Sequence, residues 1–232
     1  MSEPAYQLDR VCFRYPRGGF ALSIDALTIE RASVVALGGP NGSGKTTLLL
    51  LLAFLDRPST GKIRFFGSLA APDGDGRVRE AAVLVPYPPY LFRGTARHNL
   101  CLGLEIRRVP RSQWNERLAP VIEALDLGPL LDRSGRALSA GQAQRLAIAR
   151  ALVLRPEVLL LDEPFASLDQ EQSERLSALL HGLNRERKLT IVFSAHRGNT
   201  IDSLPPLQTV RLNEGRLSSS GRILHGPPKA GH

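Results

Sequence analysis

Residues 39–46, GPNGSGKT, are the stretch that decides the fold of this 232-residue chain. They match the pattern G-x-x-x-x-G-K-[ST], and they lie between a short apolar run, residues 33–37, and a leucine-rich stretch that starts at Lys45. The order strand, glycine-rich turn, helix is the context in which this pattern binds phosphate. The sequence therefore predicts a phosphate-binding loop on an α/β sheet.

Each residue type in this loop suits phosphate binding for a physical reason. Glycines allow backbone conformations that turn successive N–H groups toward phosphate oxygens, and the start of the helix adds a favourable dipole. We expect the Lys45 ammonium to contact the β- and γ-phosphates and the Thr46 hydroxyl to coordinate Mg2+. The predicted nucleotide contacts are Gly39, Pro40, Asn41, Gly42, Ser43, Gly44, Lys45, Thr46 and Thr47.

Two acids follow a run that is typical of a buried strand. Residues 158–161 (VLLL) precede Asp162 and Glu163. Ligands bind at the carboxyl ends of strands in open α/β sheets. Asp162 is suited to hold Mg2+ through water, and Glu163 is suited to polarise the attacking water at the γ-phosphate. The alternative, an acidic cap of the following helix, is less favoured beside Lys45.

The composition excludes several classes of protein. The longest apolar run, residues 48–55, is far shorter than the roughly 20 residues that a membrane-spanning helix needs. Arginines account for much of the net charge of +8, but they are scattered and lack an aromatic stacking platform, so we expect no nucleic acid partner. The first ten residues do not read as a secretory signal. Cys12 and Cys101 form no disulfide framework, which favours a reducing compartment.

Hydrophobic patterns give the order of elements. Residues 6–15 and 21–29 suggest antiparallel strands, and residues 189–194 suggest another buried strand after a helix at about residues 170–187. Between residues 95 and 132 longer helical segments are broken at Pro110, Pro120 and Pro129. Alternation of strands and helices favours a parallel sheet covered by helices.

The expected fold class is therefore α/β. We expect a P-loop NTPase core with a mainly parallel sheet, an N-terminal antiparallel β subdomain and a helical subdomain insertion at about residues 95–150. Residues 1–217 are predicted to form a single domain. Residues 218–232, rich in Ser, Gly and Pro, are predicted to form a loosely ordered tail.

The order of these motifs resembles the ATP-binding cassette family over about residues 5–217. The decisive segment is residues 138–142 (LSAGQ), just before a helix and upstream of Asp162. In the family this segment reaches across a head-to-tail dimer to the γ-phosphate of ATP held by the partner. The resemblance implies this role for Ser139, Gly141 and Gln142. The family usually has a second glycine where this chain has Ala140, and we expect dimer closure to survive that methyl group.

Three further matches follow from the resemblance. Tyr15 stands where an aromatic residue stacks on adenine, residues 167–169 (SLD) look like the loop that bridges the two sites of the dimer, and His196 resembles the histidine that contacts the γ-phosphate. Each of them alone would be read as ordinary packing or as a loop residue. Their order and spacing favour the functional interpretation, with Glu163, His196 and Lys45 as the catalytic residues.

One position departs from the family. Residues 85–95 (VPYPPYLFRGT) align with the loop where a glutamine normally contacts Mg2+, and Tyr87 occupies that position here. A phenol has one oxygen and cannot offer an amide oxygen to Mg2+ with the same reach. We expect weakened or retimed hydrolysis with ATP binding kept.

The resemblance implies an ATPase that converts ATP and water to ADP and phosphate and powers a membrane transporter. The implied cofactors are ATP and Mg2+. The implied partners are separate transmembrane permease subunits, a second copy of the cassette in a homodimer, and a substrate-binding protein outside the membrane. The implied location is peripheral, at the cytoplasmic side of the cell membrane.

An unfused cassette looks more like importers than like the commonest exporters. Residues 99–110 and 149–169 are similar to oxyanion uptake ATPases, including those for tungstate or molybdate. Two alternatives stay open. One is a cassette that acts on DNA or ribosomes, and the other is a cassette that drives lipid or cell-envelope remodelling.

Overall fold

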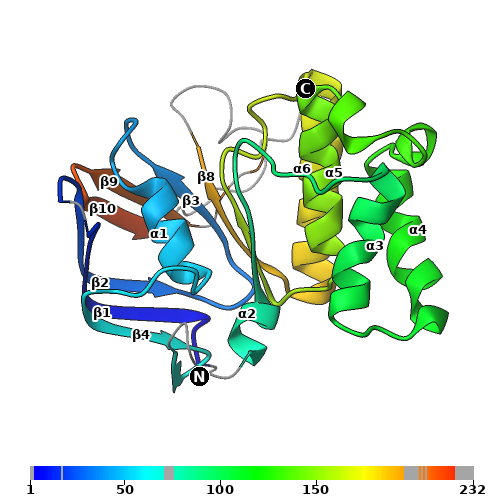
Figure 1. The fold of residues 1–232 in the computed structure, drawn as a ribbon. Helices are drawn as coiled ribbons and strands as arrows, with labels where there is room; N and C mark the ends of the chain where they lie inside the picture. Colours follow the sequence, from blue (N-terminus) through cyan, green and yellow to red (C-terminus); the bar gives the residue numbers. More distant parts are fainter. Residues whose placement is uncertain are drawn as a thin grey trace, which may run out of the picture.

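One curved sheet organises the protein in the computed structural model, which describes residues 3–16, 18–70, 76–195, 204, 206 and 208–222 (Figure 1). In these residues the sheet has ten strands in the order β5-β4-β1-β2-β10-β9-β3-β8-β7-β6. The strands are β1 (Tyr6–Arg14), β2 (Ala21–Ile29), β3 (Val34–Gly38), β4 (Thr60–Phe65), β5 (Ser68–Leu69), β6 (Ala82–Val85), β7 (Val158–Leu161), β8 (Thr190–Ser194), β9 (Gln208–Asn213) and β10 (Arg216–Arg222).

Helices cover this sheet on both faces. They are α1 (Lys45–Leu52), α2 (Arg77–Ala81), α3 (Ala96–Ile106), α4 (Trp114–Ala124), α5 (Ala140–Leu152) and α6 (Gln170–Arg187), with short 3-10 turns η1 (Arg111–Gln113), η2 (Gly128–Leu130) and η3 (Gly135–Ala137). In Figure 1, α1 lies between the antiparallel strands and the parallel strands, and α3–α6 lie together on the other side of the parallel strands. The predicted α/β class is confirmed.

The parallel half contains β9, β3, β8, β7 and β6. Strand β3 pairs in parallel with both β8 and β9, and β7 pairs in parallel with β8 and β6. All residues of β7 and β8 are buried. Strands covered on both faces read as continuous apolar runs, which is why their sequences show no alternation.

The antiparallel half is joined to the same sheet. Strand β1 pairs antiparallel with β2 and β4 over nearly its full length. Strand β10 then links the two halves, because it pairs antiparallel with β9 and makes one parallel bridge to β2, Arg216 to Ser23. The predicted antiparallel subdomain is therefore continuous with the core through two strands, β9 and β10, that the sequence patterns did not indicate.

Strand β3 separates two hydrophobic clusters. Val35 and Leu37 pack in the cluster that contains α1 and the antiparallel strands, whereas Val34 and Ala36 pack in the cluster that contains α3–α6. Successive side chains of a strand point to opposite faces, so four residues of β3 serve two cores. Burial on both faces fixes the position of the loop that follows Gly38.

Helix α1 is held at its end as well as along its side. Leu48, Leu49, Leu51 and Leu52 are fully buried. The hydroxyl of Tyr6 in β1 donates to the Leu52 carbonyl oxygen at 2.8 Å, and this carbonyl is one of those that a helix leaves unpaired at its C-terminus. Burial raises the pKa of Tyr6 well above its usual value, so the hydroxyl stays protonated and remains a donor.

The helical insertion lacks one of the helix breaks that the sequence predicted, the one at Pro120. Helix α4 runs from Trp114 through Pro120 to Ala124, so the predicted break at Pro120 is wrong. Trp114 and Val121 are buried, and Leu118 and Ile122 pack against the same core. Burial of this apolar face outweighs the hydrogen bond that Pro120 cannot donate.

The ordered structure extends past residue 217. Strand β10 continues to Arg222 because its partner β9 supplies hydrogen bonds, whereas the predicted boundary was placed at Leu217. Residues 223–232, the rest of the predicted tail, lie outside the described residues. None of the helices in the described ranges has the length and apolar character to span a membrane.

We predict that Tyr6→Phe lowers the free energy of unfolding by about 1–2 kcal/mol, because the buried Leu52 carbonyl loses its donor while packing is retained. Urea denaturation of the purified chain measures this loss. Tyr90→Phe is the matched control, since Tyr90 is 65% exposed, and we expect no measurable change. Equal effects of the two substitutions would contradict the assigned role of Tyr6.

Candidate functional site

The phosphate-binding loop leaves β3 and enters α1 with backbone conformations that need glycine. Gly39 has φ 145° and Gly44, the residue before α1, has φ 105°. A Cβ atom at Gly39 would lie 2.3 Å from the Leu212 carbonyl oxygen, and one at Gly44 would lie 2.8 Å from the Phe20 ring. Both positions therefore exclude a side chain, and the loop is held against β9 and Phe20.

Two side chains in the loop are placed to bind an anion. The Lys45 ammonium donates to the Gly39 and Pro40 carbonyl oxygens, at 2.8 and 3.0 Å, which holds it over the loop. Burial lowers the pKa of Lys45 from its usual value, and the carboxylates of Glu163 and Asp162 oppose that shift. The Ser43 hydroxyl oxygen is buried and has no hydrogen-bond partner among the described residues. A buried polar atom of this kind fits a phosphate oxygen.

Three side chains from different elements meet beside the loop. Asp162 accepts hydrogen bonds from the Thr46 hydroxyl at 2.7 Å and from the Ser194 hydroxyl at 2.5 Å. They lie at the start of α1 and at the carboxyl ends of β7 and β8. Hydroxyl and carboxylate oxygens are the ligands that Mg2+ prefers. The donor set of Thr46 and Asp162 therefore fits this ion.

Glu163 follows Asp162 in a strained conformation. Its φ is 43°, in the left-handed region that residues with side chains rarely adopt. Its backbone N–H donates to the Ser194 hydroxyl at 2.8 Å, so Ser194 fixes both acids. The turn places Glu163 at the cleft beside Lys45, where a carboxylate can accept a proton from a water molecule.

A cleft of about 370 Å3 opens above the loop. Its lining includes the aromatic residues Tyr15 and Phe20 together with Glu163. The Tyr15 hydroxyl lies 3.3 Å from the Thr47 hydroxyl, and its ring packs edge-on against Phe13. Tyr15 is partly exposed, so its ring is free to stack on a planar base. The remaining lining residues are Asn41, Gly42, Gly44, Lys45, Thr46 and Thr47.

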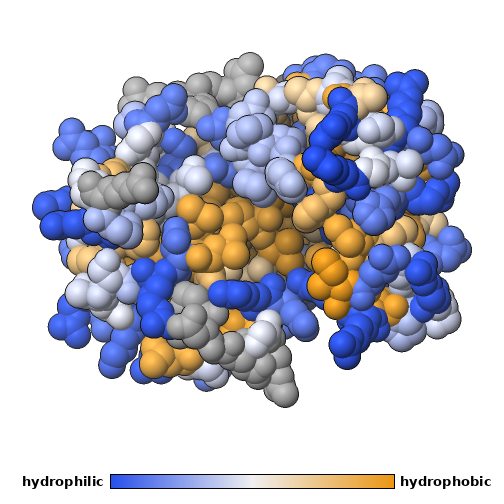
Figure 2. Space-filling view, in the orientation of Figure 1, coloured by the Kyte–Doolittle hydropathy of each residue, from blue (hydrophilic) through white to orange (hydrophobic). Residues whose placement is uncertain are grey.

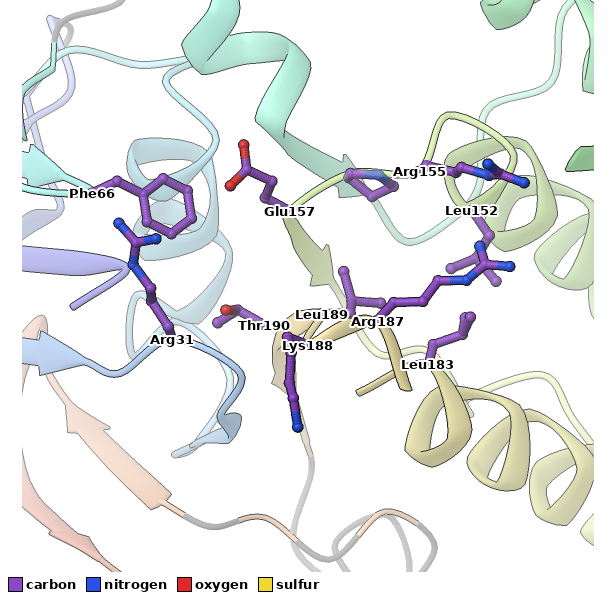
Figure 3. Close-up of a pocket in the computed structure, with 11 residues that line it drawn as sticks. Arg31, Phe66, Leu152, Arg155, Glu157, Leu183, Arg187, Lys188, Leu189 and Thr190 are labelled. Atoms are coloured by element: carbon purple, nitrogen blue, oxygen red, sulfur yellow. The ribbon is translucent and has the colours of Figure 1, made fainter. Parts of the chain in front are cut away.

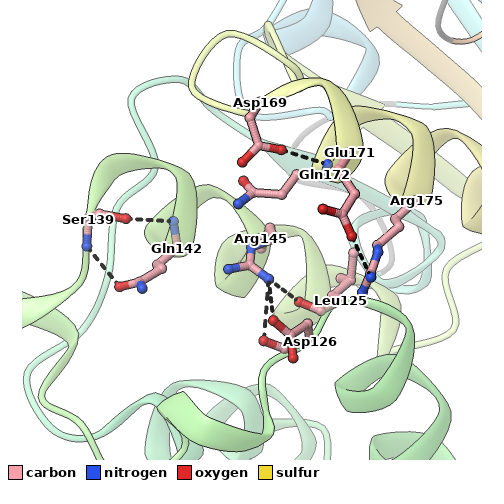
Figure 4. A network of polar contacts seen from close by, with 9 residues as sticks. All are labelled: Leu125, Asp126, Ser139, Gln142, Arg145, Asp169, Glu171, Gln172 and Arg175. Carbon is pink, nitrogen blue, oxygen red and sulfur yellow. Dashed lines mark hydrogen bonds and ion pairs between the residues drawn. The ribbon is translucent and has the colours of Figure 1, made fainter.

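The segment with Ser139 forms the start of α5 (Figure 4). The Ser139 hydroxyl accepts from the Gln142 backbone N–H at 3.3 Å, and the Gln142 side chain accepts from the Ser139 N–H at 3.1 Å. This reciprocal pair is a capping box. Ser139, Gly141 and Gln142 are not among the described residues that line the cleft. The capping box thus fixes the start of α5, and this segment does not line the described cleft.

Helix α5 is fixed to the end of helix α4 through Arg145 (Figure 4). Its guanidinium is buried and donates to the Leu125 and Asp126 carbonyl oxygens at 2.7 and 3.3 Å, with the Asp126 carboxylate at 3.6 Å. A buried cation needs such partners. The orientation of α5 therefore depends on the end of α4.

The loop of residues 166–169 packs against α5. A Cβ atom at Gly141 would lie 2.6 Å from the Ser167 carbonyl oxygen, so only glycine allows this approach. Asp169 then caps α6 by accepting from the Gln172 N–H at 2.8 Å. The segment from Glu163 to Asp169 therefore contacts Gly141 through Ser167 and then ends at the capped start of α6.

Tyr87 lies in the loop between β6 and α3. Its hydroxyl is 3.1 Å from the Ser167 hydroxyl. Farther along this loop the Asn99 side chain bonds to the backbone of Phe92 and Thr95, and Arg150 of α5 donates to the Tyr90 carbonyl oxygen at 2.8 Å. The loop is thus attached to α3 and α5.

A second cavity, about 310 Å3, lies at the amino ends of the parallel strands (Figure 3). Several of its basic residues follow the C-termini of α5 and α6, where cations balance the helix dipole. Arg155 donates to Glu116 at 2.6 Å, and the Arg31 guanidinium lies over the Phe66 ring. Helix ends and these internal contacts account for the charge around this cavity. The lining also includes Leu152, Leu183, Arg187, Lys188, Leu189 and Thr190.

The predicted site residues fall into three groups. The phosphate-binding loop, Asp162, Glu163 and Tyr15 come together around one cleft. Ser139, Gly141 and Gln142 lie apart from it on α5, and His196 lies outside the described residues. Sequence reasoning missed Ser194 and Phe20. The sequence offered a signal for Ser194, because this polar residue ends the apolar run of β8, the strand next to the one that precedes Asp162. It offered no such signal for Phe20.

Comparison with known proteins agrees with this arrangement. The profile of the ABC transporter family matches residues 22–166. The chain is 42% identical over 197 residues to the sulfate/thiosulfate import ATP-binding protein CysA of Thermosynechococcus vestitus, and the match covers 84% of this chain and 57% of CysA. The chain thus spans just over half the length of that relative.

Solved structures match along almost the whole chain. The structure of cbiO1 from Clostridium perfringens, part of the ABC transporter complex cbiONQ, has a TM-score of 0.81 at 29% identity, covering 95% of this chain and 89% of cbiO1. A dimeric bacterial ABC transporter cassette has a TM-score of 0.84 at 25% identity, covering 95% of this chain and all of that cassette. Because the family profile covers more than half of the sequence and the fold agrees with these cassettes, this chain belongs to the ABC transporter family, whose ATP-binding cassette it contains.

Proposed function

We propose that this chain binds and hydrolyses Mg-ATP as one of two paired cassettes that power a membrane importer. The observation that carries the proposal is the convergence of Lys45, Asp162 and Glu163 at one end of three parallel strands. A cation, a metal ligand and a general base are the three groups that phosphoryl transfer to water requires.

Each group has a separate task. The Ser43 hydroxyl, the Lys45 ammonium and the N–H groups at the start of α1 bind the phosphates. Thr46 and Asp162 would hold Mg2+, which supplies neutralising charge for the phosphates when it is bound. Glu163, with its backbone fixed by Ser194, accepts a proton from the attacking water. His196 is proposed to contact the γ-phosphate, and Tyr15 and Phe20 face the base.

The position of Ser139 supports a dimer. A helix start with polar groups binds anions, yet Ser139, Gly141 and Gln142 do not line the chain's own cleft among the described residues. A second copy in head-to-tail arrangement would bring them to the partner's nucleotide. ATP then closes the pair because it binds the closed state more tightly, and hydrolysis removes that difference.

An exposed apolar surface supports a membrane partner. Figure 2 shows apolar residues gathered in the middle of one face, between the antiparallel strands and the helical half. In addition, three aromatic side chains of the loop after β6 are exposed. Tyr87, Tyr90 and Phe92, here called the docking patch, are 37%, 65% and 40% exposed. Arg150 lies 5.0 Å from the Phe92 ring centre and donates to Tyr90, so the patch is built on α5. Exposed aromatics over a fixed base are typical of a protein contact.

We therefore propose separate permease subunits as occupants of the docking patch, which places the cassette at the cytoplasmic side of the membrane. Relatives named for import of sulfate or thiosulfate and for the cbiONQ complex support import and a multi-subunit assembly. The first of these names also supports an inorganic oxyanion as the substrate, delivered by a binding protein outside the membrane.

We predict that Glu163→Gln lowers ATP turnover by about 10²- to 10⁴-fold and traps an ATP-bound dimer, because the amide cannot accept the proton of water. Light scattering after gel filtration in saturating Mg-ATP measures the dimer. Glu123→Gln, at an exposed position of α4, is the matched control and should behave as the unmodified chain. Recovery of monomers alone from the Glu163→Gln chain would count strongly against the paired mechanism.

Tyr87→Gln should raise steady-state turnover by about three- to tenfold, the factor that one interaction of about 1 kcal/mol supplies, since an amide oxygen can reach Mg2+. A coupled ATPase assay measures the rate. Leu69→Gln, at the exposed edge of the antiparallel strands, provides the control. An unchanged rate in the Tyr87→Gln chain would show that the missing amide does not limit hydrolysis.

Affinity capture from gently solubilised native membranes tests the partner. We expect a multi-spanning protein to copurify with the chain, and we expect Tyr90→Asp to reduce its recovery about tenfold, since aromatic anchors dominate interfaces. Leu69→Asp, equally exposed but on β5, should retain recovery. Copurification of ribosomes or DNA without a membrane protein would overturn the transport assignment.

A further inference from the structure

Tyr87 joins the docking patch to the segment that carries the general base. Its hydroxyl lies 3.1 Å from the Ser167 hydroxyl, although the two residues are 80 positions apart. Tyr87 follows β6, and Ser167 lies between Glu163 and the start of α6. This side-chain contact bridges the loop proposed to receive the permease and the loop proposed to bridge the two nucleotide sites.

Ser167 is well placed to transmit a displacement. The Ala166 N–H donates to the Glu163 carbonyl oxygen at 3.2 Å, and the Leu168 N–H donates to the Phe165 carbonyl oxygen at 3.2 Å, so residues 163–168 form consecutive turns. The Ser167 carbonyl oxygen also packs directly on Gly141. A shift of Ser167 therefore moves the turn after Glu163 and changes the contact with the start of α5.

The other end of the docking patch is attached to the same helix. Arg150, in the last turn of α5, donates to the Tyr90 carbonyl oxygen at 2.8 Å. Tyr87 reaches Ser167, which contacts Gly141 in the first turn of α5. The docking patch is thus connected to both ends of α5, by an arginine bond at one end and by the Tyr87 hydroxyl at the other.

The two connections differ in strength. Arg150 is partly buried, and its cationic group bonds to a carbonyl oxygen while it lies over the Phe92 ring. The Tyr87 contact is a bond between two neutral hydroxyl groups at a partly exposed position. A bond of this kind changes an equilibrium by only about fivefold, so binding of a partner can break it.

We propose that Tyr87 is a positioning residue that restrains the segment of residues 163–169 through Ser167 until a partner docks on Tyr90 and Phe92. Docking moves the loop after β6, the bond to Ser167 breaks, and the segment becomes free to adjust to the second cassette. This inference rests on the proposed function for its partner, but the restraint itself is a property of the single chain.

Removal of either hydroxyl tests the restraint. We expect Tyr87→Phe and Ser167→Ala each to raise turnover of the isolated chain about fivefold with an unchanged KM for ATP, and the double variant to match either single one. Phenylalanine offers no oxygen to Mg2+, so a rise cannot come from metal binding. Ser167→Thr keeps a hydroxyl and should restore the original rate, while Ser68→Ala controls for loss of an exposed serine hydroxyl.

Hydrogen exchange provides a readout without catalysis. The amides of Ala166 and Leu168 should exchange about fivefold faster in Tyr87→Phe and in Ser167→Ala than in the unmodified chain. Unchanged exchange, or multiplicative effects of the two substitutions on turnover, would overturn the proposed restraint. If exchange rises while no variant, nor the unmodified chain, hydrolyses ATP, the restraint stands and the proposed function fails.

Discussion

The Asp162 carboxylate is the constraint on which the site depends. It accepts hydrogen bonds from Thr46 at the start of α1 and from Ser194 at the end of β8, so one side chain ties three elements together. These elements carry the phosphate-binding loop, both acids and the strand that leads to His196. Because Asp162 is only 4% exposed, these bonds are not weakened by competing water. The fold therefore fixes the oxygens that we propose as metal ligands before any nucleotide arrives.

Much of the architecture could be predicted because it rests on local signals. The loop of residues 39–46 requires glycine at Gly39 and Gly44 for the close approaches that the structure shows, and the apolar runs of β7 and β8 report burial on both faces. Strands β9 and β10 escaped prediction because long-range pairing supports them rather than their own composition. The break predicted at Pro120 was wrong for a similar reason, since burial of the apolar face of α4 outweighs the local tendency of proline to end a helix.

Part of the candidate site could likewise be predicted from local signals, and part could not. Lys45, Thr46, Asp162 and Glu163 could be proposed from the sequence because residue type and position, at a helix start or after a strand end, suggest their chemistry. The contact between Tyr87 and Ser167 could not, since no pattern encodes a side-chain bond between residues 80 positions apart. The sequence alone presents Tyr87 as the loss of a metal ligand, whereas the structure adds a partner for its hydroxyl.

The capping box at α5 shows how a structural role and a binding role can share one side chain. The Ser139 hydroxyl oxygen accepts from the Gln142 N–H, which uses a lone pair and leaves the hydroxyl proton available. The Gln142 side chain meanwhile accepts from the Ser139 N–H and keeps the helix start rigid. The dipole of α5 favours an anion at this end. A phosphate held by a second cassette would therefore accept a hydrogen bond from the Ser139 hydroxyl without breaking the cap, so binding would carry no cost in helix stability.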